Sequence, residues 1–361
     1  MKYIDEYRDK EICKKFSDKI HKISPNRDIT FMEVCGTHTM SIARSGIKKL
    51  LPKNIRLLSG PGCPVCVTPN SGIDKAIAYA KMENTIITTF GDMMRVPGSS
   101  SSLAREKSLG GDVKIVYSAS DALSIAQENP AENVIFLGVG FETTSPTIAA
   151  SIKDAALKKI DNYSVLPMFK LIPPAIRAIL NSGELTINGF LLPGHVSSIT
   201  GTGIYRFISN EYGVSGSVTG FEPLDILQSI LILLRQINDG KSEIANQYKR
   251  AVKQEGNQSA LSLLKEVFET EDTEWRGIGF IKESGLKIRE RYGSFDAERK
   301  IPVEAELTKE NPECICGDIL RGVKIPSDCK LFDKVCNPEN PIGPCMVSSE
   351  GTCAAYYKYE R

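Results

Sequence analysis

The chain alternates between short apolar runs and amphipathic segments over its first 240 residues. The apolar runs are rich in β-branched residues, as is typical of buried strands, and they occupy residues 29–34, 55–58, 85–90, 113–117, 134–139, 164–169, 189–192 and 217–219. The amphipathic segments predict helices near residues 39–50, 71–82, 120–128, 145–157, 173–181 and 223–238. Repeated strand–helix units predict an α/β fold, with parallel sheets that helices cover on both faces.

Two series of about four strands predict two similar Rossmann-like α/β domains, one at residues 29–130 and one at residues 131–240. Residues 1–28 are expected to form a helix that packs on the C-terminal domain. The domain boundary is placed next to a polar Asn-Pro step at residues 129–130, because such steps favour turns between elements.

The pattern changes after residue 240. It predicts helices at residues 241–253 and 259–268 and a short extended stretch at residues 278–281. From residue 311 the chain is rich in Pro, Gly and Cys and has little periodicity, so its own core is expected to be small. Residues 241–361 are therefore interpreted as a mainly helical and irregular domain held together by cross-links or a metal.

The composition narrows the class of protein. The chain has 361 residues with 45 Lys and Arg against 44 Asp and Glu, so its charge gives no general reason to bind nucleic acid or an anionic membrane. Residues 1–16 mix both charges and do not resemble a signal peptide. The most apolar stretch, residues 224–237, is too short and too polar to span a bilayer. We therefore expect a cytoplasmic protein.

Unusual residues gather directly after the predicted strands. These strand-end segments are residues 35–39, 60–66, 90–92, 138–144, 193–197 and 220–223. Open α/β sheets bind ligands at the carboxyl ends of their strands, so two facing domains would line one cleft with these segments. Glycines alone could serve only the geometry of the turns. The coincidence of Cys, His, Glu and Thr in the same segments favours a site.

Cys35 lies between a predicted strand and a predicted helix. The helix N-terminus is expected to lower the pKa of its thiol, and a thiolate is both a nucleophile and a metal ligand. His38 follows within one helical turn and could orient the site or assist it. The alternative is a small buried cysteine beside a capping threonine.

Cys63 and Cys66 form a CxxC motif between glycines and prolines. In a reducing compartment this motif indicates a redox disulfide or half of a zinc site, to which Cys35 and His38 could contribute. The order of strand, CxxC and helix favours redox chemistry. A pair of thiols without a function is the remaining alternative.

Glu142 and His195 are candidates from the second series of strands. Gly138 and Gly140 are a weak dinucleotide signal, because Thr143 stands where the third glycine would be, so no nucleotide cofactor is predicted. Glu142 could be a carboxylate in the cleft or simply an acid favoured at a helix start. His195 lies on a tight turn and could be a site residue or a structural one.

Six of the ten cysteines lie in the last 48 residues, at positions 314, 316, 329, 336, 345 and 353. Paired CxxC elements, which a zinc ribbon needs, do not occur among them. The irregular spacing of Cys314, Cys329, Cys336 and Cys353 suits a cubane iron–sulfur cluster, with zinc as the alternative. Which four cysteines bind stays open, and a reducing cytoplasm makes disulfides among them improbable.

Five of these motifs together resemble the [NiFe]-hydrogenase maturation family HypD. The sequences that carry the resemblance are CGTHT at 35–39, GPGCPVC at 60–66, GFETT at 140–144, PGHVS at 193–197 and GPCMVSSEGTC at 343–353. They occur in the family's order and extend over essentially the whole chain. The resemblance implies two similar α/β domains and a third domain that holds a [4Fe-4S] cluster.

The resemblance also implies a function. Members of the family form a scaffold with a small partner, HypC, and carry an iron on which one CO and two cyanide ligands are assembled. HypE supplies cyanide made from carbamoyl phosphate by HypF, and the Fe(CN)2CO unit passes to the hydrogenase large subunit. The family is a redox-active scaffold rather than a conventional turnover enzyme, with no role for nucleic acid or membrane.

Residue roles follow from the resemblance by motif. Cys35 would be the iron ligand, with His38 and Thr39 orienting the site, and Cys63 and Cys66 would cycle between dithiol and disulfide. The [4Fe-4S] cluster, bound by Cys314, Cys329, Cys336 and Cys353, would relay electrons, and Glu142 and His195 would handle protons or anionic ligands.

Two other functions compete with this one. An iron–sulfur-dependent thiol–disulfide oxidoreductase would use the CxxC motif and the cluster but would not need Cys35. A zinc-stapled binding protein would hold zinc at the C-terminal cysteines and carry no iron.

Overall fold

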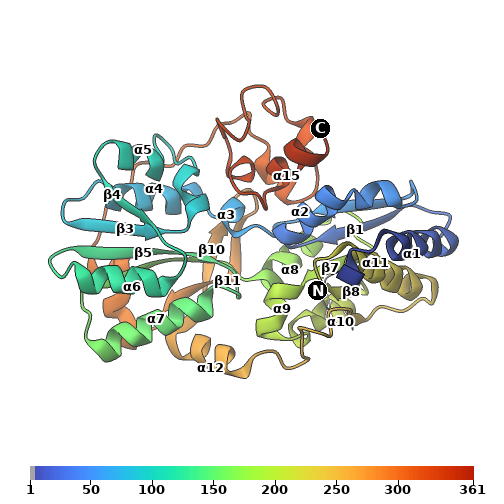
Figure 1. Ribbon diagram of the computed structural model, residues 1–361, viewed down its shortest axis with the longest axis horizontal. Helices are drawn as coiled ribbons and strands as arrows, with labels where there is room; N and C mark the ends of the chain where they lie inside the picture. Colours follow the sequence, from blue (N-terminus) through green and yellow to red (C-terminus); the bar gives the residue numbers. More distant parts are fainter. Residues whose placement is uncertain (1–4) are drawn as a thin grey trace.

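Two parallel sheets organise the protein in the computed structural model, which describes residues 5–361 (Figure 1). Sheet A has the strand order β2-β1-β7-β8-β9, and sheet B has the order β4-β3-β5-β6. Neighbouring strands in both sheets pair in parallel. These strands are β1 (Ile29–Glu33), β2 (Ile55–Ser59), β3 (Thr85–Thr89), β4 (Asp112–Ile115), β5 (Asn133–Gly140), β6 (Tyr163–Phe169), β7 (Gly189–Pro193), β8 (Ser215–Thr219) and β9 (Ile244–Asn246). The predicted α/β fold with parallel sheets is confirmed.

Helices fill the connections between these strands and cover the sheets (Figure 1). The α-helices are α1 (Lys10–Ile23), α2 (Gly36–Ser45), α3 (Pro64–Val67), α4 (Asn70–Ala80), α5 (Leu103–Ser108), α6 (Ala119–Glu128), α7 (Ser145–Lys158), α8 (Ile172–Ser182), α9 (Gly194–Thr200), α10 (Arg206–Tyr212), α11 (Pro223–Asn238), α12 (Gln258–Val267), α13 (Ala297–Lys300), α14 (Cys316–Leu320) and α15 (Thr352–Tyr359). The 3-10 turns are η1 (Asp5–Tyr7), η2 (Ile47–Leu50), η3 (Gly91–Arg95), η4 (Gly203–Tyr205), η5 (Glu290–Phe295), η6 (Pro326–Asp328) and η7 (Pro344–Met346).

The chain passes from sheet A to sheet B and back again. β5 pairs with β3, so the strands on either side of residue 130 lie in the same sheet. β7 then returns to sheet A and pairs with β1. The boundary expected at residue 130 therefore does not separate the two sheets. The prediction failed because hydrophobic periodicity shows that a strand is buried but not which strand it pairs with. The crossing brings strand ends from both halves of the sequence to one edge of sheet A.

Helix α1 packs on α11 of the sheet A half rather than on the C-terminal region (Figure 1). Its buried residues Cys13 and Ile20 join a core cluster with Leu227 and Ile230. The Ser17 hydroxyl also donates a hydrogen bond of 2.6 Å to the carbonyl oxygen of Leu50. The expected packing of the N-terminal helix on the C-terminal domain is therefore wrong for residues 10–23, because its apolar face matches that of α11.

The region after residue 240 divides between both sheets and a separate segment. β9 lies where a helix over residues 241–253 was expected, because Ile244 pairs with Gly216 at the edge of sheet A. Helix α12 confirms the second predicted helix and contacts α7. An antiparallel hairpin of β10 (Phe268–Trp275) and β11 (Gly279–Ile288) then packs on β6. Only residues beyond about 311 form the irregular, cysteine-rich segment, which lies above the junction of the two halves in Figure 1.

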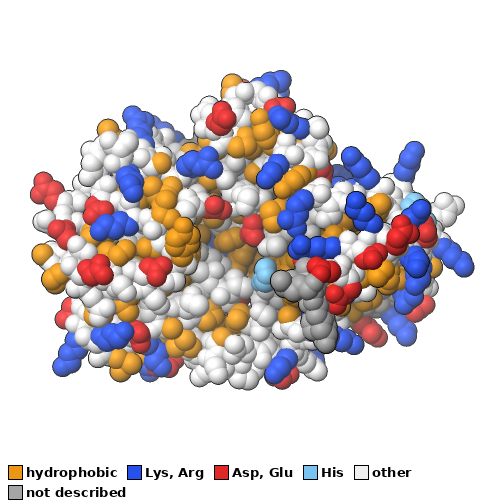
Figure 2. Space-filling view, in the orientation of Figure 1, with side chains coloured by type: hydrophobic (Ala, Val, Ile, Leu, Met, Phe, Trp, Pro, Cys, Tyr) orange, Lys and Arg blue, Asp and Glu red, His pale blue; other side chains and the backbone are white. Residues whose placement is uncertain are grey.

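Acidic and basic side chains are interspersed over the face of the molecule that Figure 2 shows, and this face is hollowed near its middle. Among residues 5–361, each helix is too short or too polar to cross a membrane.

Candidate functional site

Four strands of sheet A end side by side, and each is followed by one of the strand-end segments. β1 leads to Cys35, β2 to the CxxC motif, β7 to His195 and β8 to Phe221. The cysteine-rich segment covers this edge, since α15 contacts α2 and η7 contacts α3 (Figure 1). The carboxyl edge of sheet A is therefore the candidate site, as expected for an open α/β sheet.

Cys35 occupies the N-cap position of α2 and is buried. Burial, with the nearby carboxylates of Glu350 and Glu33, raises the pKa of its thiol to about 12. The backbone N–H groups of Thr37 and His38 act in the opposite direction but are outweighed. The helix N-terminus therefore acts in the expected direction, but the expected net lowering of the Cys35 pKa is wrong because burial outweighs it. A soft metal must displace the proton when it binds here.

Two carboxylates that sequence reasoning missed hold the Cys35 turn. Glu33 is buried, accepts the N–H of Cys35 at 2.9 Å and accepts the hydroxyl of Thr39. Burial raises the pKa of Glu33 to about 7. Glu350, from the cysteine-rich segment, accepts the hydroxyl of Thr37 at 2.6 Å. The signal in the sequence was an acid at the end of an otherwise apolar strand.

His38 is fully buried, and its geometry fixes its tautomer. Its Nε2 lies 3.0 Å from the carbonyl oxygen of Gly220 and 3.2 Å from that of Thr219. Because carbonyl oxygens only accept, Nε2 carries the proton and Nδ1 presents a lone pair. Nδ1 has no hydrogen-bond partner. Burial lowers the pKa of His38 to about 4, so the ring is neutral.

His195 is joined to His38 through one aromatic ring. Phe221 stacks on His195 with ring centroids 3.9 Å apart and on His38 with centroids 4.9 Å apart. His195 remains exposed, but partial burial lowers its pKa. The predicted residues His38 and His195 thus belong to one aromatic group at the sheet edge.

A buried ion pair supports the loop that holds His38. Asp225 is fully buried and accepts hydrogen bonds from Arg250 at 2.7 and 2.5 Å and from the N–H of Glu222 at 3.1 Å. Glu222 in turn binds Arg8 near the N-terminus through both carboxylate oxygens. These contacts fix the loop whose carbonyl oxygens accept the hydrogen bond from His38 Nε2.

Cys63 and Cys66 are joined as a disulfide at the start of α3, directly beside Cys35. The N–H of Gly36 donates to the carbonyl oxygen of Gly62 at 2.8 Å. A Cβ atom on residue 62 would lie only 2.1 Å from the Cys35 nitrogen. The loop that carries the disulfide therefore touches the backbone of the Cys35 turn.

The C-terminal cysteines form one connected group that contains a close pair. The Sγ atoms of that pair, Cys316 and Cys345, lie 2.8 Å apart. Further interactions join Cys345 with Cys353, Cys314 with Cys316 and Cys353, Cys353 with Cys336, and Cys336 with Cys329. The pair also lies near the disulfide, since Cys66 Sγ is 3.9 Å from the carbonyl oxygen of Pro344.

The structure does not decide which group the C-terminal cysteines hold. Among residues 5–361, no three His, Cys, Asp or Glu side chains surround a position for a single metal ion. The thiols at 314, 329, 336 and 353 lie in the same irregular segment, and cysteine thiolates are the usual ligands of iron–sulfur clusters.

Glu142 lies shortly after the end of β5 in sheet B. It is buried, and its Oε1 accepts the N–H of Ile172 at 3.0 Å, whereas its Oε2 has no partner. Burial raises the pKa of Glu142 to about 7. Tyr205, at the end of η4, is also buried, and burial raises its pKa well above the usual range.

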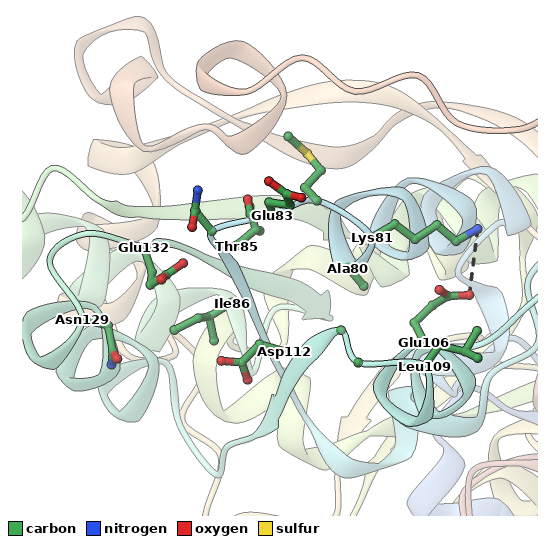
Figure 3. Close-up of a pocket in the computed structure, with 14 residues that line it drawn as sticks. Ala80, Lys81, Glu83, Thr85, Ile86, Glu106, Leu109, Asp112, Asn129 and Glu132 are labelled. Atoms are coloured by element: carbon green, nitrogen blue, oxygen red, sulfur yellow. Dashed lines mark hydrogen bonds and ion pairs between the residues drawn. The ribbon is translucent and has the colours of Figure 1, made fainter.

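A separate cavity lies at the opposite edge of sheet B (Figure 3). It has a volume of about 510 Å³, and its lining includes Glu83, Glu106, Asp112 and Glu132. Lys81 and Glu106 form an ion pair of 3.9 Å beside it. The strands begin at this edge, and none of the predicted site residues lines the cavity, so we assign it no part in the site.

Known proteins resemble the chain over nearly its whole length. The family described as "HypD: Hydrogenase formation hypA family" matches residues 11–360. The hydrogenase maturation factor HypD of Cupriavidus necator is 48% identical over 100% of this chain and 98% of its own length. The factor of the same name from Azotobacter vinelandii is 46% identical over 100% and 97%. That of Rhodobacter capsulatus is 43% identical over 99% and 98%.

Proposed function

Because the chain belongs to the HypD family of hydrogenase maturation factors, we propose that it is a redox-active scaffold on which an iron unit is assembled. In this proposal it acts in the cytoplasm with the small partner HypC and builds the Fe(CN)2CO unit of the [NiFe]-hydrogenase. HypE donates the cyanide, and the hydrogenase large subunit receives the product. The iron unit is therefore a cargo rather than a resident cofactor.

One observation carries the proposal. Cys35, the Cys63–Cys66 disulfide and the C-terminal cysteines meet at one edge of sheet A, although they come from distant parts of the sequence. An iron ligand, a two-electron couple and a cluster need such closeness if electrons are to reach the iron. No other function that we considered explains all three groups together.

Cys35 is the proposed ligand from this chain. A thiolate is a soft donor and suits the electron-rich iron that cyanide and CO require. The free thiol keeps its proton because it is buried next to two carboxylates, so the positive charge of the iron drives deprotonation. Glu33 and Thr39 hold the turn, and His38 offers an unprotonated Nδ1 at the same place.

The remaining cysteines form the proposed electron path. Cys314, Cys329, Cys336 and Cys353 would hold a [4Fe-4S] cluster, which supplies electrons one at a time. The sulfur atoms of Cys316 and Cys345 lie 2.8 Å apart, and Cys345 directly follows Pro344, whose carbonyl oxygen is 3.9 Å from Cys66 Sγ. Loss of two electrons and two protons would join Cys316 and Cys345 as a disulfide.

The Cys63–Cys66 disulfide is the end of this path. Its reduction breaks one S–S bond, takes up two electrons and two protons and yields two thiols. An external donor reduces the cluster by one electron at a time, so two electron transfers are needed to reduce the disulfide once. Reoxidation of the two thiols beside Cys35 would form the S–S bond again and release two electrons and two protons.

Infrared spectroscopy of protein purified without oxygen, together with HypC, tests the proposal. Cyanide and CO stretching bands are expected in the unmodified protein and are expected to vanish in Cys35→Ala. Cys13→Ala is a matched control, because Cys13 is also a buried cysteine but lies in α1. Both variants should keep the C-terminal cluster. Bands that survive in Cys35→Ala would contradict the assignment of the ligand.

An iron–sulfur-dependent thiol–disulfide oxidoreductase is the second candidate. The disulfide beside the C-terminal cysteines favours it, since those groups alone would suffice. It predicts turnover with a protein disulfide that depends on Cys63 and Cys66 but not on Cys35. Absence of the infrared bands in protein with an intact cluster and active upstream partners would support this candidate.

A further inference from the structure

We propose that the Arg276 guanidinium donates a hydrogen bond to the anionic metal–thiolate group that Cys314 helps to bind, and that it stabilises the reduced form of that group. This inference rests on the proposed function, in which the group is a [4Fe-4S] cluster, and it adds a residue that sets the reduction potential. Arg276 belongs to none of the sequence motifs that carry the family resemblance. It lies in the turn between β10 and β11.

This hairpin turn is held between the helix of the CxxC motif and the first helix of the cysteine-rich segment. The N–H of Arg276 donates a hydrogen bond of 2.9 Å to the carbonyl oxygen of Val67, the last residue of α3. Gly277 packs on the backbone of α14, because a Cβ atom on Gly277 would lie only 2.1 Å from the Cα of Gly317. Gly317 directly follows Cys316. The backbone of Arg276 is therefore fixed beside the C-terminal cysteines.

Arg276 and two of the C-terminal cysteines border the same space. A cavity of about 300 Å³ has Arg276, Cys314 and Cys316 in its lining. The two cysteines pack on one glycine, because a Cβ atom on Gly343 would lie 2.8 Å from Cys314 Sγ and 3.7 Å from Cys316 Cβ. The positive charge of Arg276 also acts on both thiols. A group bound at Cys314 would therefore share this cavity with the arginine side chain.

The side chain of Arg276 is buried and incompletely paired. It is only 8% exposed, and its Nε forms an ion pair of 3.0 Å with the half-exposed Glu310. Its Nη1 is buried and has no hydrogen-bond partner within residues 5–361. An ion pair with a half-exposed carboxylate does not require burial of the guanidinium, and a buried donor without a partner is destabilising unless a ligand satisfies it. The unpaired Nη1 therefore indicates an anion bound at the neighbouring cysteines.

The chemistry of a metal–thiolate group matches this arginine. Four thiolates give a [4Fe-4S] cluster a net negative charge, and the sulfur atoms of such a cluster accept hydrogen bonds. Arginine stays protonated in proteins and presents several N–H donors in a fixed plane. Gain of one electron from the external donor makes the cluster more negative, so Arg276 stabilises the reduced form more than the oxidised form. Its presence therefore raises the reduction potential of the cluster.

A redox titration of the anaerobic protein, followed by the electron paramagnetic resonance signal of the reduced cluster, tests this inference. The reduction potential is expected to be lower in Arg276→Gln than in the unmodified protein, with Arg276→Lys, which keeps the charge, between the two. Arg95→Gln is the matched control. Arg95 also donates to the cysteine-rich segment, at 2.8 Å to the carbonyl oxygen of Pro338, but it is exposed to solvent. The potential of this control should equal that of the unmodified protein.

The outcomes separate the inference from the proposed function. An unchanged potential in Arg276→Gln would overturn the inference and leave the proposed function intact. Zinc in place of iron and acid-labile sulfide in the unmodified protein would overturn both. If Arg276→Gln does not fold or does not hold a cluster, the unmodified protein is prepared with arginine that carries a nitrogen isotope label in its guanidinium group. Pulsed electron paramagnetic resonance of the reduced cluster is then expected to show coupling to the label, and its absence would overturn the inference.

Discussion

Replacing Gly62 by Ala tests the contact between the disulfide loop and the iron-binding turn. A Cβ atom there would lie 2.1 Å from the nitrogen of Cys35, 2.4 Å from its Cα and 2.4 Å from the carbonyl carbon of Val34. Ordinary van der Waals contact begins at 3.4 Å, and all three atoms are backbone, so no side chain can yield. The loop must therefore move by more than an ångström.

The expected loss of stability follows from this geometry. Overpacking of this kind costs about 1–3 kcal/mol. The displaced loop also loses the hydrogen bond from Gly36 N–H to the Gly62 carbonyl, which contributes about 1 kcal/mol. We therefore expect Gly62→Ala to lower the free energy of unfolding by about 2–4 kcal/mol. The disulfide should also move away from Cys35, and the iron should be retained less well.

Urea unfolding and iron analysis of the anaerobic protein measure both effects. Gly91→Ala is the matched control, because Gly91 also follows a strand but its added Cβ would meet only Ile115 Cγ2, at 3.8 Å. That variant should keep its stability and its iron. If Gly62→Ala behaves like Gly91→Ala in both measurements, the loop does not rest on the Cys35 turn, and the reasoning fails.

Two further predictions concern the groups around this contact. The pKa of Glu142 is about 7 in the folded protein against 4.5 when unfolded, so its stabilisation is complete below pH 4.5 and is lost as the pH rises through 7. Between pH 5 and 8, the free energy of unfolding measured in urea should fall by up to about 3 kcal/mol more in the unmodified protein than in Glu142→Gln. The same dependence on pH in both proteins would contradict this prediction. Asp225→Ala leaves Arg250 without its partner and should cost about 3 kcal/mol in thermal or urea unfolding, whereas Asp154→Ala, which breaks an exposed pair, should cost less than about 0.5 kcal/mol. Comparable losses in these two variants would show that the ion pair does not support the loop.

The sequence predicted the strands of the two sheets up to β8 because most of them are buried, whereas the more exposed β9 and β10 were missed. A run such as that of β5, which is apolar after Asn133, is detected directly by hydrophobic patterning. Pairing of strands is set by contacts between distant residues, such as Phe31 with Gly189, which local patterns do not encode. The boundary at residue 130 was misplaced for this reason.

In the candidate site, too, the sequence predicted features that depend on neighbouring residues and missed those that depend on residues far apart in the chain. Cys35 and the CxxC motif stand out by residue type and spacing, and the structure brings them into contact. Glu33 looks ordinary in the sequence, and only its burial and its hydrogen bonds to the Cys35 turn identify it. The direction of the Cys35 pKa was also missed, because its largest cause is burial, which depends on the whole fold, and because Glu350, which raises it further, comes from the other end of the chain.

The central claim is that the cysteine groups act as one redox path beside Cys35, and Cys316→Ser tests it most directly. The cluster-loaded protein is reduced by a light-driven one-electron donor without oxygen, and the thiols of Cys63 and Cys66 are counted by alkylation and mass spectrometry. The account predicts that the disulfide opens in the unmodified protein and stays closed in Cys316→Ser with its cluster intact. Opening at the same rate in both proteins would contradict the path.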